Sequence, residues 1–395
     1  MISTKMIKLT ESNSVIRAMF EEGNRLAQLH GRENIYDFSL GNPNIPSPPA
    51  IKNAIIDITE NEDPIALHGY MSNIGYPAVR EAVAKSLNTR FETNFNEKNI
   101  IMSSGAAGGL NVVLKTLINP GDEVVVISPF FVEYGNYVNN FDGKLVIVPA
   151  NPDDFMPNPK LISKAITAKT KAIIINSPNN PTGVIYTKKT IKQLAEILYE
   201  KEKEYGSPIY IISDEPYREL VYDGIKVPFI TKYYKNTIIC YSWSKSLSLP
   251  GQRIGYIIIP SEIEDYELIF DAAGIATRIL GFVNAPALIQ RVAAKCLYEQ
   301  VNIGAYDTNR KLLYNNLKDL GFEPIYPQGA FYLWLKTPGD DKEFVQAAKK
   351  YNILLVPGTA FMCPGYARIA YCVSTEKIEN SLPAFKKLAK ELELL

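Results

Sequence analysis

The sequence predicts an α/β protein with a mainly parallel central sheet sandwiched by helices, followed by a smaller α+β domain. The first observation is a repeated unit of a short apolar run, a polar turn and a helical stretch. The second is that the apolar runs are continuous and rich in Val and Ile, which is typical of strands buried on both faces of a parallel sheet. The runs cover residues 123–127, 144–148, 171–175, 209–212, 237–240 and 255–259.

The last third of the chain has a different pattern, which predicts a second domain. A chain of 395 residues exceeds the size at which one hydrophobic core usually stops growing. We expect an N-terminal segment over 1–45 that joins the small domain, a large domain over 46–284, and the small domain over 285–395. Helices are predicted at 11–31, beginning after Thr10 or Ser12, at 49–60 and at 76–93, and in the last third a long helix precedes strands at 330–335, 353–356 and 367–373 and a final helix.

The composition excludes several classes of partner. Lys plus Arg and Asp plus Glu both number 42, so no net charge attracts the chain to nucleic acid or to a membrane surface. No segment approaches the roughly 20 apolar residues of a membrane span, and the first residues lack the apolar stretch of a secretory signal. The four cysteines show no CxxC pair, and we expect free thiols in a cytoplasmic protein.

Three polar motifs follow three of the predicted strands. They are SPNNPTG at 177–183, SDEPY at 213–217 and SWSKSLSLPGQRIGY at 242–256. Each motif alone is a common kind of turn or helix cap. Because ligands bind at the carboxyl ends of parallel strands, their occurrence in this order predicts one shared site.

The third motif has the pattern SxSKxxxxxGxRxGY, and with it the chain resembles the class I/II aminotransferases over nearly its whole length. These are fold-type I enzymes that depend on pyridoxal 5′-phosphate (PLP) and are typified by aspartate aminotransferase. The resemblance implies that Lys245 carries PLP as a Schiff base and then acts as the base. It also implies that Asp214 pairs with the pyridinium nitrogen, and that Asn180 and Tyr217 hydrogen-bond the phenolic oxygen of the cofactor.

Further positions match residues of the family that hold the cofactor. Ser242, Ser244 and Arg253 match its phosphate ligands. The turn Gly105, Ala106 and Ala107 precedes a helical run and is expected to offer backbone N–H groups to the same phosphate. Phe131, in SPFFVEY, matches the aromatic residue that stacks on the cofactor ring. No metal site is predicted.

The remaining matches concern the substrate and the neighbouring subunit. Arg368 matches the arginine that binds the α-carboxylate of the substrate, with Gly41 and Asn180 beside it. Tyr70 matches a tyrosine that reaches the phosphate of the neighbouring subunit, so the resemblance implies a homodimer with shared active sites. Arg278 lies near the position of an arginine that, in one branch of the family, crosses from the partner subunit to a distal carboxylate.

The predicted reaction is ping-pong transamination from an L-amino acid to a 2-oxo acid such as 2-oxoglutarate. Aspartate is the first expected donor and aromatic amino acids are the next, although Ala107 stands where another branch has a lysine for the distal carboxylate. Two alternatives remain open. One is a PLP-dependent carbon–sulfur β-lyase acting on cystathionine-type substrates, and the other is a PLP-binding protein without turnover.

Overall fold

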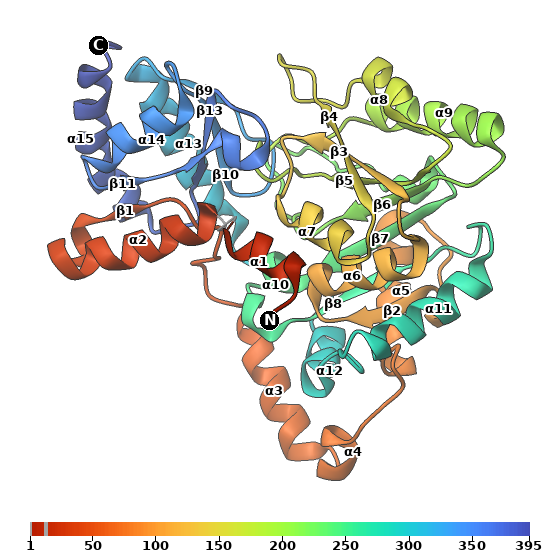
Figure 1. Cartoon of the computed structure of the whole chain (residues 1–395). Coiled ribbons are helices and arrows are strands. Elements are labelled where there is room, and N and C mark those ends of the chain that lie inside the picture. The colour runs from red at the N-terminus through yellow and green to blue at the C-terminus, as the bar shows by residue number, and fades with distance from the viewer. Residues whose placement is uncertain (1, 12–14) are drawn as a thin grey trace.

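A computed structural model describes residues 2–11 and 15–395 and contains a seven-stranded sheet in its larger part (Figure 1). The strand order is β2-β8-β7-β6-β5-β3-β4. All neighbours pair in parallel except β8, which is antiparallel to both β2 and β7. The strands are β2 (Ile100–Ser103), β3 (Glu123–Ser128), β4 (Lys144–Pro149), β5 (Thr170–Asn176), β6 (Tyr210–Asp214), β7 (Thr237–Ser242) and β8 (Gly255–Ile258).

Helices cover both faces of this sheet. Apolar residues of α6, α7 and α11 pack on one face, whereas those of α3, α5, α8, α9 and α12 pack on the other. The helices of this part are α3 (Pro49–Asn61), α4 (Pro64–His68), α5 (Pro77–Phe91), α6 (Gly105–Leu117), α7 (Glu133–Asn140), α8 (Pro159–Ala165), α9 (Lys188–Tyr205), α10 (Trp243–Ser246), α11 (Tyr266–Ile279) and α12 (Ala287–Lys295). None of the helices in the described part of the chain has the length and apolar character needed to cross a bilayer.

The smaller part joins the C-terminal third to the N-terminal segment. Its four-stranded antiparallel sheet has the order β12-β13-β10-β9, and β1 pairs in parallel with β11. Helix α2 runs beside β1 and β11 in Figure 1. The elements are α1 (Thr4–Glu11), α2 (Val15–His30), β1 (Tyr36–Asp37), α13 (Ile303–Asp319), β9 (Glu323–Ile325), β10 (Tyr332–Lys336), α14 (Asp341–Lys349), β11 (Ile353–Leu354), β12 (Val356–Pro357), β13 (Tyr366–Ala370) and α15 (Thr375–Glu391).

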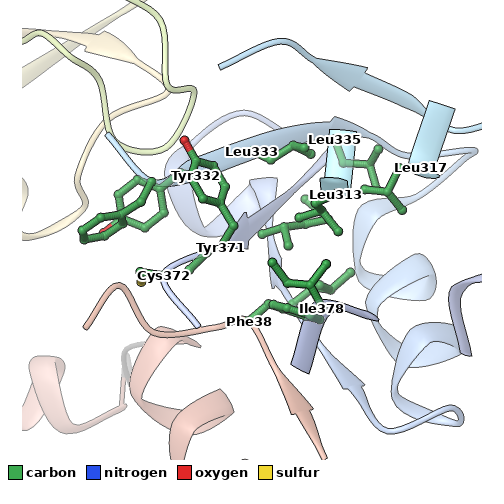
Figure 2. Packing of buried hydrophobic residues seen from close by; sticks show 14 of the residues in the cluster. Phe38, Leu313, Leu317, Tyr332, Leu333, Leu335, Tyr371, Cys372 and Ile378 are labelled. Carbon is green, nitrogen blue, oxygen red and sulfur yellow. The ribbon is translucent and has the colours of Figure 1, made fainter. Parts of the chain in front are cut away.

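The two parts share core residues, which fixes the segment after β6 against the small domain. Figure 2 shows part of the small-domain core, where Phe38 and side chains of β10, α13 and α15 pack together. Tyr217 and Leu220, which follow β6, belong to the same cluster. In the other direction, Trp334 and Phe361 of the small domain pack among residues of β3, β5 and α9.

The predicted fold class is confirmed, and the six apolar runs are all strands of one sheet. Two details of the prediction were wrong. Strand β4 is an edge strand with a partly exposed burial pattern, and β8 is antiparallel, although continuous apolar runs suggested fully buried parallel strands. The short strands β2 and β9 and the helix α1 were not predicted, and residues 12–14 of the predicted first helix lie outside the described residues. The four cysteines are free.

We propose that the boundary of the small domain lies after α12 rather than at residue 285. Ile289, Val292 and Ala293 of α12 pack with residues of α3 and α5 in a cluster of the large domain. Residues of α13 pack in the small-domain core instead. The sequence pattern could not separate these helices, since both are amphipathic and nothing local indicates which core each one covers.

Candidate active site

The three polar motifs converge on one pocket of about 260 Å³ at the carboxyl ends of β5, β6 and β7. These strands are neighbours in the sheet, so their ends lie at the same edge. The lining residues are Leu40, Gly41, Ala106, Ala107, Leu110, Phe131, Asn176, Asn180, Asp214, Pro216, Tyr217, Ser242, Ser244, Lys245, Pro250, Arg253, Tyr332 and Arg368. The convergence predicted from strand order is therefore present.

Lys245 enters the pocket from the short helix α10, which begins directly after β7. The Ser242 side chain caps this helix by accepting a hydrogen bond from the Ser244 backbone N–H. The Lys245 Nζ atom donates to the Gly41 carbonyl oxygen at 2.8 Å. Burial lowers the pKa of Lys245 to about 8, and the nearby Arg253 and Arg368 act in the same direction while Cys372 opposes them. A buried amine with such a pKa is partly neutral near physiological pH, as a nucleophile or base requires.

Asp214 is the last residue of β6, and its carboxylate is buried at the floor of the pocket. The Tyr134 hydroxyl donates to Oδ2 at 2.5 Å, and the Asn176 side-chain amide donates to the Asp214 backbone carbonyl at 2.8 Å. Oδ1 is buried and has no hydrogen-bond partner among the described residues. Burial raises the pKa of Asp214 to about 7. A buried acceptor of this kind lacks a donor that a bound ligand could supply.

The candidate phosphate ligands lie around the N-terminus of α6. The Ser242 and Ser244 hydroxyl oxygens are 2.7 Å apart. The Nη1 atom of Arg253 donates a hydrogen bond to the Pro250 carbonyl oxygen at 3.0 Å, which holds the guanidinium in place. Gly105, the first residue of α6, has a φ of 73° and lies so close to Arg253 that an added Cβ would be 2.8 Å from Nη2. A side chain at 105 would therefore displace the guanidinium, and a helix start with free N–H groups beside an arginine and two hydroxyls suits an anion.

Arg368 lies on the small-domain side of the pocket, on β13. Its guanidinium donates to the Asn180 side-chain oxygen at 3.0 Å and to the Ser39 carbonyl at 2.5 Å. The Nε atom is buried without a hydrogen-bond partner among the described residues. Burial lowers the pKa of Arg368 from its ordinary value, although an arginine remains charged at any physiological pH. The site thus contains a buried cation with an unused donor, as a carboxylate ligand would need.

Gly41 lies against the Tyr332 side chain, and the Tyr332 ring in turn contacts the Arg368 guanidinium. An added Cβ at Gly41 would be 1.9 Å from the Tyr332 hydroxyl oxygen, so the chain needs a glycine there. Tyr332 in turn exchanges a hydrogen bond with the Tyr217 hydroxyl at 3.0 Å, and its ring lies 4.6 Å from the guanidinium carbon of Arg368. Burial raises the pKa of Tyr217 well above its ordinary value, so the hydroxyl stays protonated and can donate.

Two of the predicted site residues lie outside this pocket. Tyr70, on the segment between α4 and α5, has 91% of its surface exposed. Arg278 lies on an exposed part of α11. Neither lines the pocket of its own chain, whereas every other predicted position lines it or, for Gly105, borders Arg253.

Sequence reasoning missed three residues that hold the floor and the wall of the pocket. Asn176 and Tyr134 both occur in segments that were considered, but no pattern assigned them a partner. Tyr134 lies three residues after Phe131, and the two rings meet edge to face with their centroids 5.6 Å apart. Tyr332 sits in an apolar strand, where its sequence context is that of any core aromatic residue.

The donors and acceptors of the pocket fit PLP. The orphan carboxylate oxygen of Asp214, the amine of Lys245 and the donor set around α6 correspond to a ring nitrogen, an aldehyde and a phosphate. Among the residues that the structure describes, the only carboxylate lining the pocket is that of Asp214, while three cationic side chains, Lys245, Arg253 and Arg368, also line it. This charge balance suits an anionic cofactor and a carboxylate substrate.

Comparison with known proteins identifies the family. The model of the family described as aminotransferase class I and II matches residues 33–385. Aspartate aminotransferase of Pyrococcus horikoshii is 30% identical over 96% of this chain and 95% of that protein. Aromatic-amino-acid aminotransferase 2 of Thermococcus litoralis is 31% identical over 97% of each.

Solved structures agree with these relatives. An amino transferase from Eubacterium rectale superimposes with a TM-score of 0.96 at 45% identity, covering 99% of this chain and 98% of that one. Aspartate aminotransferase from Thermus thermophilus with maleate gives a TM-score of 0.85 at 26% identity, covering 95% and 97%. The chain therefore belongs to the class I and II aminotransferases, which are PLP-dependent enzymes of fold-type I.

Proposed function

We propose that this chain holds PLP at Lys245 and moves the amino group of an L-amino acid to a 2-oxo acid such as 2-oxoglutarate. One observation carries the assignment of the residues. The buried Oδ1 of Asp214 has no partner among the described residues and faces the same pocket as the Lys245 amine. A buried carboxylate oxygen without a donor is costly, and a protonated ring nitrogen would satisfy it.

The residues of the pocket have distinct roles in this proposal. When bound, PLP supplies an electron-accepting ring that draws electrons from the substrate Cα. Ser242, Ser244, Arg253 and the N-terminus of α6 would hold the phosphate, and Phe131 would pack against the ring. Asn180 and Tyr217 would supply hydrogen-bonding groups to the phenolic oxygen.

Arg368 and Lys245 act on the substrate itself. The Arg368 guanidinium binds the α-carboxylate and so orients the Cα–H bond, while Asn180 and the Ser39 carbonyl hold the guanidinium. The Lys245 amine, with a pKa of about 8, removes the Cα proton and returns a proton to the product. The apolar wall formed by Leu40, Leu110 and Phe131 limits the access of water.

Two donor classes fit this pocket in different ways. An aromatic or other apolar side chain can pack on the apolar wall without help from a second chain. Aspartate needs a further cation, because the three cations that line the pocket in the described part of the chain already have roles and Ala107 supplies none. We propose that Arg278 of the partner subunit provides that cation, with Tyr70 of the partner subunit at the phosphate.

A homodimer is part of this proposal, and the surface of α11 supports it. Leu268, Ile275 and Ile279 have 70%, 52% and 58% of their surfaces exposed. Their spacing of seven and four residues places them on one face of the helix that also carries Arg278. Exposed apolar stripes of this kind mark protein interfaces.

The experiment combines the full chain, PLP, L-phenylalanine or L-aspartate, and 2-oxoglutarate. We expect glutamate and the matching 2-oxo acid in equal amounts, with Asp214→Asn strongly impaired. The exposed variant Lys85→Ala serves as the matched control. Pyruvate released from cystathionine without an added 2-oxo acid, in the absence of amino-group transfer, would instead identify a β-lyase and overturn the proposal.

A further inference from the structure

We propose that Tyr134 is a positioning residue for Asp214, and that its hydrogen bond holds the carboxylate in place and favours its ionised form. The inference rests on the proposed function, since Asp214 contributes to the reaction only when PLP is bound. Tyr134 does not line the pocket, so it acts through Asp214 rather than on the substrate.

The geometry leaves the Tyr134 hydroxyl little freedom. The side chain is buried, and its ring packs against those of Phe130 and Phe131, with centroid distances of 6.3 and 5.6 Å. The hydroxyl oxygen is 2.5 Å from Oδ2 of Asp214. Because Oδ2 is used in this way, the carboxylate is turned so that the unpartnered Oδ1 remains available to a ligand.

The hydrogen bond from Tyr134 opposes two effects that favour the protonated form of Asp214. Burial raises the pKa of Asp214 to about 7 and Glu215 acts in the same direction, whereas the hydrogen bond from Tyr134 lowers it. Without that bond the pKa would rise further, and more of the carboxyl group would be protonated at neutral pH. A protonated carboxyl pairs poorly with a protonated ring nitrogen.

Few other groups near Asp214 titrate between pH 6 and 9. Burial raises the pKa values of Tyr134, Tyr137, Tyr217 and Cys240 above their ordinary ranges, so these groups stay neutral there. Asn176 does not titrate, and Glu215 forms a buried ion pair with Arg218. Lys245 in the same pocket has a pKa of about 8, but its titration is common to wild type and the variants proposed below.

The sign of the pH effect follows from linkage. A carboxyl group whose pKa is higher in the folded than in the unfolded state destabilises the fold as pH rises from the unfolded pKa to the folded pKa. In Tyr134→Phe the pKa of Asp214 is higher, so the fold continues to lose stability up to a higher pH than in the wild type. The stability gap between the two proteins therefore widens between pH 6 and pH 9.

The test measures melting temperatures of the cofactor-free full chain from pH 5 to pH 9, so it does not depend on activity. We expect the gap between wild type and Tyr134→Phe to grow by about 1–3 °C between pH 6 and pH 9. Tyr137→Phe is the matched control, because it lies on the same helix but donates no hydrogen bond to Asp214, and its gap should stay constant. In the Asp214→Asn background, Tyr134→Phe should add no pH dependence.

A second readout is the affinity for PLP, measured by titrating the cofactor-free proteins. We expect Tyr134→Phe to bind PLP about tenfold more weakly than wild type near pH 7.5, since a hydrogen bond to a charged acceptor contributes at this scale. A stability gap that is the same at every pH, or equal to that of Tyr137→Phe, would show a packing role and overturn the inference. Failure of the wild type to bind PLP would instead overturn the proposed function, while the pH measurement on cofactor-free protein would still decide the role of Tyr134.

Discussion

Asp214 and Arg368 belong to the buried lining, or floor, of the pocket and have 5% and 2% of their surfaces exposed, whereas Tyr70, proposed to reach the rim of a partner subunit's pocket, has 91% exposed. The floor residues are held by hydrogen bonds within one chain, from Tyr134 to Asp214 and from Arg368 to Asn180 and Ser39. Arg278, the other candidate for the rim, is exposed as well. The difference fits the proposal that one chain supplies the groups that perform the chemistry, while Arg278 and Tyr70 act only across an interface with a second chain.

The largest expected effect comes from removing the amine at the floor. In Lys245→Ala we expect turnover to fall by at least about 10⁴-fold, since the variant loses both the nucleophile and the general base. The visible absorption of the PLP-loaded protein should be lost in the same variant. Steady-state kinetics and an absorption spectrum measure the two effects, and a Lys245→Ala enzyme with wild-type turnover would contradict the assignment of the floor.

The carboxylate-binding arginine should give the next largest effect. In Arg368→Ala, kcat/KM for every amino acid donor should fall roughly 10²- to 10³-fold, since charge-assisted hydrogen bonds to the α-carboxylate are lost. Arg368→Lys should recover only part of this loss, because lysine cannot present two parallel donors. A loss confined to aspartate would place Arg368 at the distal carboxylate and break the proposed division between floor and rim.

Substitution of Arg278, which is proposed to act at the rim, should change the selectivity between amino acid donors rather than the chemical step. We expect Arg278→Ala to lower kcat/KM for aspartate by about tenfold to 100-fold relative to phenylalanine, since a charged pair is removed for one donor only. The ratio of the two kcat/KM values is the measurement, and it cancels differences in active enzyme concentration. An unchanged ratio would remove Arg278 from the site.

A smaller effect should follow the ionisation of Lys245. Because burial lowers its pKa to about 8, the neutral amine is the minor form below that pH and the major form above it. The rate at which PLP attaches to the cofactor-free protein should therefore rise about tenfold between pH 7 and pH 9, following the neutral fraction of the amine. Stopped-flow absorption measures this rate, and a midpoint near the ordinary lysine value would show that burial does not act on this amine.

The fold was predictable because its signals are local and repeated. Continuous Val and Ile runs identified six strands of the seven-stranded sheet, and the positions of polar residues after β5, β6 and β7 placed Asn180, Asp214 and Lys245 in one pocket. The edge position of β4 and the antiparallel direction of β8 were not predictable, since pairing depends on contacts far along the chain. The packing of α12 on the large domain was not predictable for the same reason.

The candidate site was predicted through motifs, so residues without a motif were missed. Tyr134 and Tyr332 are aromatic residues in apolar surroundings, and only the three-dimensional structure shows that their hydroxyls meet Asp214 and Tyr217. Gly41 was expected near the substrate carboxylate. The structure adds a packing reason for the glycine, because a Cβ there would overlap the Tyr332 hydroxyl.

The most direct test of the central claim is the covalent position of the cofactor. The full chain loaded with PLP is reduced with borohydride, which makes the link between lysine and cofactor permanent, and is then digested for peptide mass spectrometry. The account predicts that the added mass of the cofactor lies on the peptide containing Lys245, and that Lys245→Ala gains no such mass. Modification at another lysine of the wild-type protein, with Lys245 unmodified, would contradict it.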